Sequence, residues 1–239
     1  MLKLILVHIS GRIGSMSYSF LSNITSLMEG VEFILGKYPY YDRDTLIDKY
    51  SSMPYSFQMI VESMKPLLGI STISKILLFD ALIGNSDRHH SNWGITETKA
   101  FLSVEKGVFP VNAMTLSPLY DNGSSLCSYI NESDIEKILK DKMRYESIIN
   151  TKSKSAIGWN SIRPIRHFEL IKNLRNEYYE STVNFVINIK KNVTEQSINA
   201  ILSNFDDNII SKQMKKLLKK FIIDRRNRII EIYNLDSEV

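Results

Sequence analysis

Apolar residues recur at helical spacing along most of this chain, and short runs of strand-like composition lie near its start and in its middle. Five runs predict strands or extended backbone: Leu2–Ile9, Ser15–Leu21, Trp93–Thr96, Phe101–Val104 and Val108–Leu119. Gly11 and Gly14 lie between the first two runs and favour a hairpin turn. The pattern therefore predicts a β-hairpin attached to a mostly helical body.

Helices are predicted wherever apolar residues lie three or four positions apart. The predicted helices are Asp44–Lys65 in two pieces broken at Pro54, an apolar helix after Gly69 that includes Ile73–Phe79, Ser133–Tyr145, His167–Tyr179, Ser181–Lys190, a short helix capped by Thr194–Ser197, and Asp207–Tyr233. The polar segment Thr151–Arg166 contains Gly158 and Pro164 and is expected to be a loop. A helix as apolar as Ile73–Phe79 belongs at the centre of the core.

The polar loop after this central helix carries candidate catalytic chemistry. Asp87 follows the helix closely, and a carboxylate at the end of a buried element is well placed to take a proton from an acceptor hydroxyl. The alternative is an ordinary helix-ending turn, since Gly84 and Asn85 both favour chain reversal. Asn92 lies five residues after Asp87, which is the spacing between the base and the metal-binding Asn of a protein-kinase catalytic loop.

A second aspartate extends this pattern. Asp121 ends the extended segment and stands shortly before Gly123, much as a metal-binding Asp precedes a Gly in protein kinases. Mg²⁺ prefers oxygen ligands and commonly takes one or two carboxylates beside phosphates and water. Asn92 and Asp121 are therefore candidate metal ligands. Three such residues in this order favour phosphoryl transfer over three unrelated turns.

The neighbours of Asp87 allow more than one interpretation. His89 either orients Asp87 and stabilises charge at the acceptor, or it lines the cleft structurally. Arg88 either holds the loop through a salt bridge or is a solvated surface residue. A zinc site at His89 and His90 is not expected, because the sequence has no further His or Cys cluster to complete it.

Composition narrows the class of partner and the compartment. The net charge of +4 does not by itself indicate a nucleic-acid partner, and the basic segment Lys212–Arg228 also carries a core-facing apolar stripe. Direct nucleic-acid binding is therefore not expected. The single Cys127 excludes an internal disulfide and fits a reducing compartment. No run approaches the roughly 18 apolar residues of a membrane span, so we expect a cytoplasmic protein without a membrane partner.

Two blocks of sequence resemble the HipA-like serine/threonine kinases of bacterial toxin–antitoxin systems. Residues 83–92 read Ile-Gly-Asn-Ser-Asp-Arg-His-His-Ser-Asn, and residues 118–121 read Pro-Leu-Tyr-Asp. The family carries Ile-Gly-Asn-x-Asp-x-His-x-x-Asn and then Pro-x-Tyr-Asp. The resemblance implies an α+β, protein-kinase-like fold, with residues 1–22 as a short β-hairpin remnant of the N-lobe and residues 23–239 as a mostly helical catalytic C-lobe.

The resemblance also implies a role for each matching residue. Asp87 is then the catalytic base, and Asn92 and Asp121 are Mg²⁺ ligands. ATP is the phosphoryl donor, and a Ser or Thr of a protein is the acceptor. Three residues are placed near the adenine: Phe20, Leu21 and Ser22.

The resemblance does not extend to the phosphate-binding half of a kinase. A kinase N-lobe carries a Gly-rich loop, a strand Lys and a helix Glu, and this sequence matches none of them. We therefore expect a truncated or split enzyme with an N-lobe or antitoxin partner chain, and Leu2–Ile9 would pair with another chain. One alternative is a non-catalytic pseudokinase that senses nucleotide or docks proteins. The other is a lipid kinase, because Asp87-Arg88-His89 is also similar to the phosphatidylinositol kinases.

Overall fold

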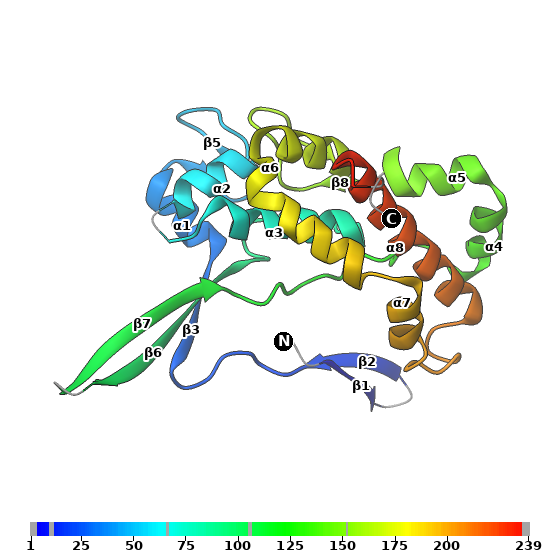
Figure 1. Cartoon of the computed structure of the whole chain (residues 1–239), viewed down its shortest axis with the longest axis horizontal. Coiled ribbons are helices and arrows are strands. Elements are labelled where there is room, and N and C mark those ends of the chain that lie inside the picture. The colour runs from blue at the N-terminus through cyan, green and yellow to red at the C-terminus, as the bar shows by residue number, and fades with distance from the viewer. Residues whose placement is uncertain (1–3, 10–11, 66, 105–106, 152, 236–239) are drawn as a thin grey trace.

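The computed structural model describes residues 4–9, 12–65, 67–104, 107–151 and 153–235. Its helices are α1 (Gly30–Lys37), α2 (Phe57–Met64), α3 (Ile70–Ile83), α4 (Glu132–Lys140), α5 (Lys142–Glu146), α6 (His167–Asn192), α7 (Glu195–Leu202) and α8 (Lys212–Ile232), with a π-helical turn at Ser147–Thr151. Its strands are β1 (Leu4–Ile9), β2 (Arg12–Ser17), β3 (Thr25–Glu29), β4 (Tyr41–Asp42), β5 (Ile47–Asp48), β6 (Gly94–Val104), β7 (Gly107–Leu116), β8 (Lys154–Ser155) and β9 (Ile165–Arg166). Figure 1 shows a helical body from which the β6–β7 hairpin projects, with the β1–β2 hairpin along its lower edge.

Helix α3 lies at the centre of the core. It packs against α6 and α8, which also contact each other (Figure 1). Its apolar side chains are almost completely buried: Ile73, Ile76, Leu77, Leu78 and Ala81. Burying a Leu or Ile side chain stabilises a fold by about 1.5–3 kcal/mol. The prediction of a central apolar helix is confirmed.

Gly84 ends α3 at a defined point. Its φ of 70° lies in the left-handed region, and its backbone N–H donates to the carbonyl of Asp80. A Cβ at this position would lie 2.7 Å from the ring of Phe221 on α8. Both the backbone conformation and the close packing therefore require glycine. This glycine therefore determines where α3 ends and where the loop after it begins.

The strands form a three-stranded antiparallel sheet in the order β3-β6-β7 and a separate β1–β2 hairpin. The hairpin prediction is confirmed, although β2 runs over Arg12–Ser17 instead of Ser15–Leu21. The two strands predicted at Trp93–Thr96 and Phe101–Val104 are one long strand, β6. Continuous pairing with β7 carries the polar residues between them into the sheet.

The sequence pattern did not predict β3 and α1. Strand β3 adds to the edge of the sheet, from Thr25 opposite Thr98 to Glu29 opposite Gly94. The N–H of Gly30, at the start of α1, then donates to the carbonyl of Trp93 at 2.9 Å. A Cβ on Gly30 would lie 2.3 Å from the Trp93 ring. Contacts with a distant segment define these elements, so local periodicity carried no sign of them.

The prediction of a helix over the first half of Asp44–Lys65 is wrong. The Asp42 carboxylate accepts hydrogen bonds from the N–H groups of Asp44 and Thr45, which starts a turn instead of a helix. The chain forms the β4–β5 hairpin, and Leu46 takes a φ of 58°. Only α2 is helical, because Ser56 caps it by accepting the N–H of Met59.

Several of the C-terminal helices begin or end at other residues than predicted, in part because of capping side chains. Asp141 interrupts the predicted helix Ser133–Tyr145, because its carboxylate accepts two backbone N–H groups at the start of α5. The two helices predicted between His167 and Lys190 are joined in α6, with a kink at Tyr178. Helix α8 begins at Lys212 instead of Asp207, after the cap Ser211. The capped short helix after Thr194 is confirmed as α7.

The predicted loop Thr151–Arg166 is mostly irregular and contains the two-residue strands β8 and β9. It closes on α2 through mutual backbone hydrogen bonds between Gly158 and the segment Tyr55–Phe57. Among the described helices, none is both long and apolar enough to cross a bilayer.

Candidate functional site

Arg88 is the hub of the candidate site. Its guanidinium binds the Asp80 carboxylate from α3, with the Nη2–Oδ1 distance at 2.8 Å. Nη1 donates to the carbonyls of both Asn92 and Tyr120 at 2.7 Å. Nη2 also donates to Oδ1 of Asn122 at 2.6 Å. One side chain therefore ties the end of α3, the loop 85–93 and the segment 120–122 into a single frame.

This ion pair is buried, which settles the two interpretations of Arg88 in favour of the salt bridge. The side chains of Arg88 and Asp80 are 0% and 2% exposed. Burial raises the pKa of Asp80, and the Arg88 guanidinium acts in the opposite direction. Breaking a buried pair by removing one partner is far more costly than losing an exposed pair. The loop position thus depends on this contact.

A second polar chain supports the loop from α6 and α8. Nε2 of His167 lies 2.8 Å from the carbonyl of Asn85, and its Nδ1 lies 2.9 Å from Oγ of Ser153. Arg225 on α8 donates from Nη1 to the same Ser153 Oγ at 2.8 Å. The pKa of His167 is lowered to about 3, by burial and by the positive charge of Arg225. The ring is therefore neutral, so that Nε2–H donates to Asn85 while Nδ1 accepts from Ser153.

Asp87 is held by its backbone and presents its side chain to solvent. Its N–H donates to Oδ1 of Asn85 at 3.1 Å, and its carbonyl accepts Nδ2 of Asn92 at 2.8 Å. The residue is exposed and lines a pocket of about 520 Å³ together with His89. A rigid backbone with an accessible carboxylate is what a general base requires.

Asn92 and Asp121 offer oxygen atoms of the kind that Mg²⁺ prefers. Nδ2 of Asn92 is used by Asp87, whereas no hydrogen bond within the described residues uses its Oδ1. The Asp121 residue is exposed, with a φ of 50°, and its carboxylate has no hydrogen-bond partner in the part of the chain that the structure describes. Arg88 binds the backbone at Asn92 and beside Asp121, which brings the two residues to the same region.

The described residues contain no group of three or more His, Cys, Asp or Glu side chains able to hold a metal. The candidate site predicted from the sequence consists of the Asn92 amide oxygen and the Asp121 carboxylate. Mg²⁺ fits such a pair, because phosphate oxygens and water commonly complete its coordination.

The two histidines of the loop have different surroundings. Nδ1 of His89 accepts the N–H of Ser91 at 3.2 Å, and the ring lines the pocket beside Asp87. His90 is buried, and its Nδ1 lies 3.0 Å from the hydroxyl of Tyr41. Burial and the charges of His89 and Arg43 lower the pKa of His90 to about 4. His90 is thus a neutral structural residue, whereas His89 lines the pocket that contains Asp87.

Of the three residues expected near the adenine, Phe20 has a contact with the site. Its ring stacks on Tyr120 with centroids 6.0 Å apart. Leu21 and Ser22 are exposed, and Ser22 Oγ donates to Oγ1 of Thr25. The linker between β2 and β3 therefore reaches the segment that ends at Asp121.

Sequence reasoning missed several residues that position the loop: Asp80, Asn122, Ser153, His167 and Arg225. One signal was present, because Asp80 is a lone charge in an otherwise apolar stretch of α3, and a buried charge needs a partner. The others carried no comparable local sign. Their partners lie far away in the sequence.

No family model matches the chain. The chain is similar to the serine/threonine-protein kinase CtkA of Helicobacter pylori, with 22% identity over 153 residues, which are 64% of this chain. The aligned segment is 42% of the length of CtkA, so the chain spans less than half of the relative that it matches.

A solved structure extends this similarity to the whole chain. The crystal structure of a Helicobacter pylori proinflammatory kinase CtkA matches 100% of this chain and 78% of its own, with a TM-score of 0.74 and 15% sequence identity. At this identity the match establishes the fold. The chain therefore has an α+β, protein-kinase-like fold, as the two sequence blocks implied.

Proposed function

We propose that this chain is the catalytic part of a serine/threonine protein kinase that uses ATP and Mg²⁺. One observation carries the proposal: Arg88 binds Asp80, the carbonyls of Asn92 and Tyr120, and the side chain of Asn122 at once. This contact holds the candidate base and the candidate metal ligands in one frame, as phosphoryl transfer requires. The similarity to CtkA supports the same function.

Asp87 is proposed to act on the acceptor hydroxyl. Its carboxylate takes the hydroxyl proton while the acceptor oxygen bonds to the γ-phosphorus and the bond to the bridging oxygen of ADP breaks. His89, whose Nδ1 accepts from the N–H of Ser91, would donate a hydrogen bond from Nε2–H at the acceptor. Magnesium, held by Asn92 and Asp121, would supply charge neutralisation at the phosphates.

The finer assignment is to the HipA-like kinases of toxin–antitoxin systems, and it rests on the blocks 83–92 and 118–121. With this assignment we propose that residues 1–22 form an N-lobe hairpin and residues 23–239 form the C-lobe. We also propose that Phe20–Ser22 contact the adenine, and that the protein is bacterial and cytoplasmic. An N-lobe chain or an antitoxin is the proposed protein partner. It would supply the Gly-rich loop and the strand Lys that this sequence does not match.

A second candidate function is a non-catalytic module that binds nucleotide or protein. It is favoured by the same lack of a match to the Gly-rich loop and Lys, the parts that grip the α- and β-phosphates in kinases. The two functions differ in one measurable step, the transfer of phosphate to a protein.

Calorimetric titration with ATP and Mg²⁺ tests the proposal, followed by a transfer assay with radiolabelled ATP. We expect wild type to bind ATP only when Mg²⁺ is present, and Asp121→Ala to bind at least about tenfold more weakly, since it loses a charged metal ligand. The matched control is Asp134→Ala on α4, a half-buried acid remote in sequence from the loop. Absence of nucleotide binding by wild type would exclude catalysis by this chain alone. Equal binding by Asp121→Ala would overturn the metal assignment.

A further inference from the structure

The pocket that contains Asp87 is built from three segments. Arg43 comes from the β4–β5 turn, Asp87 and His89 from the loop after α3, and Lys154 and Arg163 from β8 and the approach to β9. An acceptor hydroxyl that approaches Asp87 through this pocket passes its other lining residues. Its lining therefore determines which residues are accepted beside that hydroxyl.

Three cations line the pocket, and none of them forms an ion pair with a described residue: Arg43, Lys154 and Arg163. Arg163 donates from Nε to the carbonyl of Ala156 at 2.8 Å. Arg43 and Lys154 are exposed, and their side chains have no hydrogen bond within the described residues. Three positive charges thus face the pocket without an acidic partner in the described part of the chain.

The nearby acids do not balance these cations. Asp42 is already paired with Lys49 at 2.5 Å. Asp44 is the one other acid in the lining besides Asp87 itself. His90, the buried neutral histidine at the pocket, adds no charge, and the charge of Arg43 is among the causes that lower its pKa. With Asp44 and Asp87 set against Arg43, Lys154 and Arg163, the lining keeps a net charge of +1 for a ligand to neutralise.

We infer that this pocket binds an acidic acceptor segment, in which Asp or Glu residues flank the Ser or Thr whose hydroxyl lies at Asp87. The inference rests on the proposed kinase function and adds its substrate class. Carboxylates on the segment would supply counter-charges for Arg43, Lys154 and Arg163, whereas lysines there would be repelled. Charge complementarity of this kind chiefly determines which partner is selected.

Direct binding of two labelled peptides to the full chain tests the inference without any need for catalysis. One peptide has a central serine flanked by glutamates, and the other has the same length with lysines in their place. We expect the glutamate peptide to bind wild type at least about tenfold more tightly by fluorescence anisotropy, a preference that falls as sodium chloride is added.

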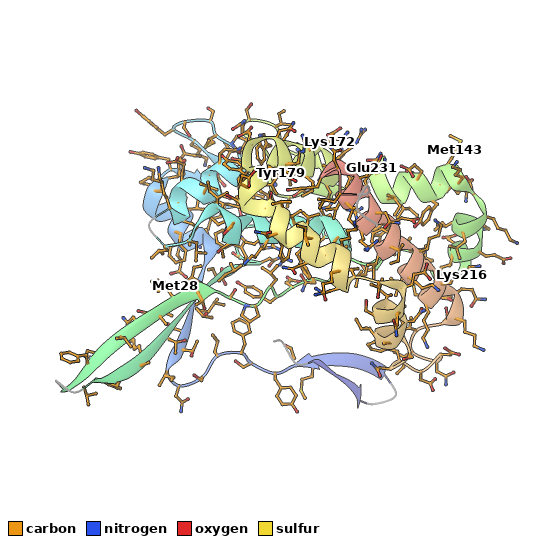
Figure 2. The ribbon with its side chains drawn as sticks, in the orientation of Figure 1. Met28, Met143, Lys172, Tyr179, Lys216 and Glu231 are labelled. Atoms are coloured by element: carbon orange, nitrogen blue, oxygen red, sulfur yellow. The ribbon has the colours of Figure 1, made fainter. Side chains whose placement is uncertain are left out.

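Charge reversal locates the binding site. We expect Arg43→Glu/Lys154→Glu to weaken the glutamate peptide at least about tenfold and to strengthen the lysine peptide. The matched control, Lys142→Glu/Lys216→Glu, makes the same change in net charge on α5 and α8. Figure 2 labels Lys216 on α8 and Met143, the residue that follows Lys142 on α5, at the right of the view. Strand β5, which follows Arg43 in the chain, lies at the upper left of Figure 1 in the same orientation. The control variant should bind both peptides within about twofold of wild type.

Two results would overturn the inference: no preference of wild type for the glutamate peptide, or the same weakening in both double variants. The ATP titration above tests the kinase function separately. A retained glutamate preference without nucleotide binding would exclude catalysis by this chain alone and leave the acidic preference in place. Nucleotide binding with no peptide preference would contradict the acidic substrate class alone.

Discussion

Arg88 and Asp80 form an ion pair in which both side chains are almost fully removed from solvent, with the nitrogen and oxygen 2.8 Å apart. We predict that Arg88→Met lowers the free energy of unfolding by about 3–5 kcal/mol, because it leaves the Asp80 charge buried without a partner. Urea unfolding followed by circular dichroism measures this change. The exposed pair of Arg144 with Asp141 provides the control, and Arg144→Met should change stability by less than about 1 kcal/mol. A similar small loss for Arg88→Met would contradict the proposed hub.

Asp87→Asn is expected to remove phosphoryl transfer without affecting the fold. The amide cannot accept the hydroxyl proton, so the transfer rate should fall by about 10²–10⁴-fold. Stability should stay within about 0.5 kcal/mol, because the Asp87 side chain is exposed and its backbone makes the structural hydrogen bonds. Asp44→Asn, which changes another carboxylate of the same pocket, should retain transfer within about tenfold. Retention of transfer by Asp87→Asn would exclude Asp87 as the base.

Gly84 and Gly36 offer a matched pair for substitution by alanine. Gly84→Ala should cost about 1–3 kcal/mol, because its φ is 70° and the new Cβ would lie 2.7 Å from Phe221. Gly36 lies within α1, and a methyl group added there would meet no described atom within 4 Å outside its chain neighbours and the backbone of its own helix. Gly36→Ala should therefore stabilise the chain by up to about 1 kcal/mol. Thermal unfolding of both variants measures the difference, and equal effects would contradict this account of the end of α3.

The stability of the chain should fall in acid through His167. Its pKa is lowered from 6.5 to about 3 in the folded state. Between these values the unfolded chain binds more protons, so stability decreases as pH falls below about 6.5. At pH 5 the loss relative to pH 7 should be about 2 kcal/mol from this residue alone.

Urea unfolding of wild type and His167→Gln at pH 7 and pH 5 isolates this contribution. The variant cannot take up the proton, so its loss between the two pH values should be smaller than that of wild type by about 2 kcal/mol. Parallel losses would show that His167 does not titrate as its burial indicates.

Local sequence predicted the features that depend on near neighbours. The apolar run Ile73–Phe79 predicted a central helix, and Thr194 with Ser197 predicted a helix start. Asp87, Asn92 and Asp121 were identified from their order and spacing, and their roles remain predictions. Helix periodicity, capping and motif spacing all act over a few residues, so they can be read along the chain.

Boundaries failed where a local turn or a distant partner competed with periodicity. The carboxylate of Asp42 started a turn in a segment with helical spacing, and Asp141 divided another. Strand β3 and helix α1 depend on Trp93 and the strand that follows it. Their formation requires contacts that a local pattern does not contain.

The sequence by itself determined the apolar helix α3, the polar loop after it and the order of the candidate catalytic residues. Only the tertiary structure decided that Arg88 would join Asp80, Asn92, Tyr120 and Asn122 in one buried frame. It also decided which charges surround Asp87, because the walls of that pocket come from segments more than a hundred residues apart. Hydrogen bonds and charges act through space, and only folding brings their partners within reach.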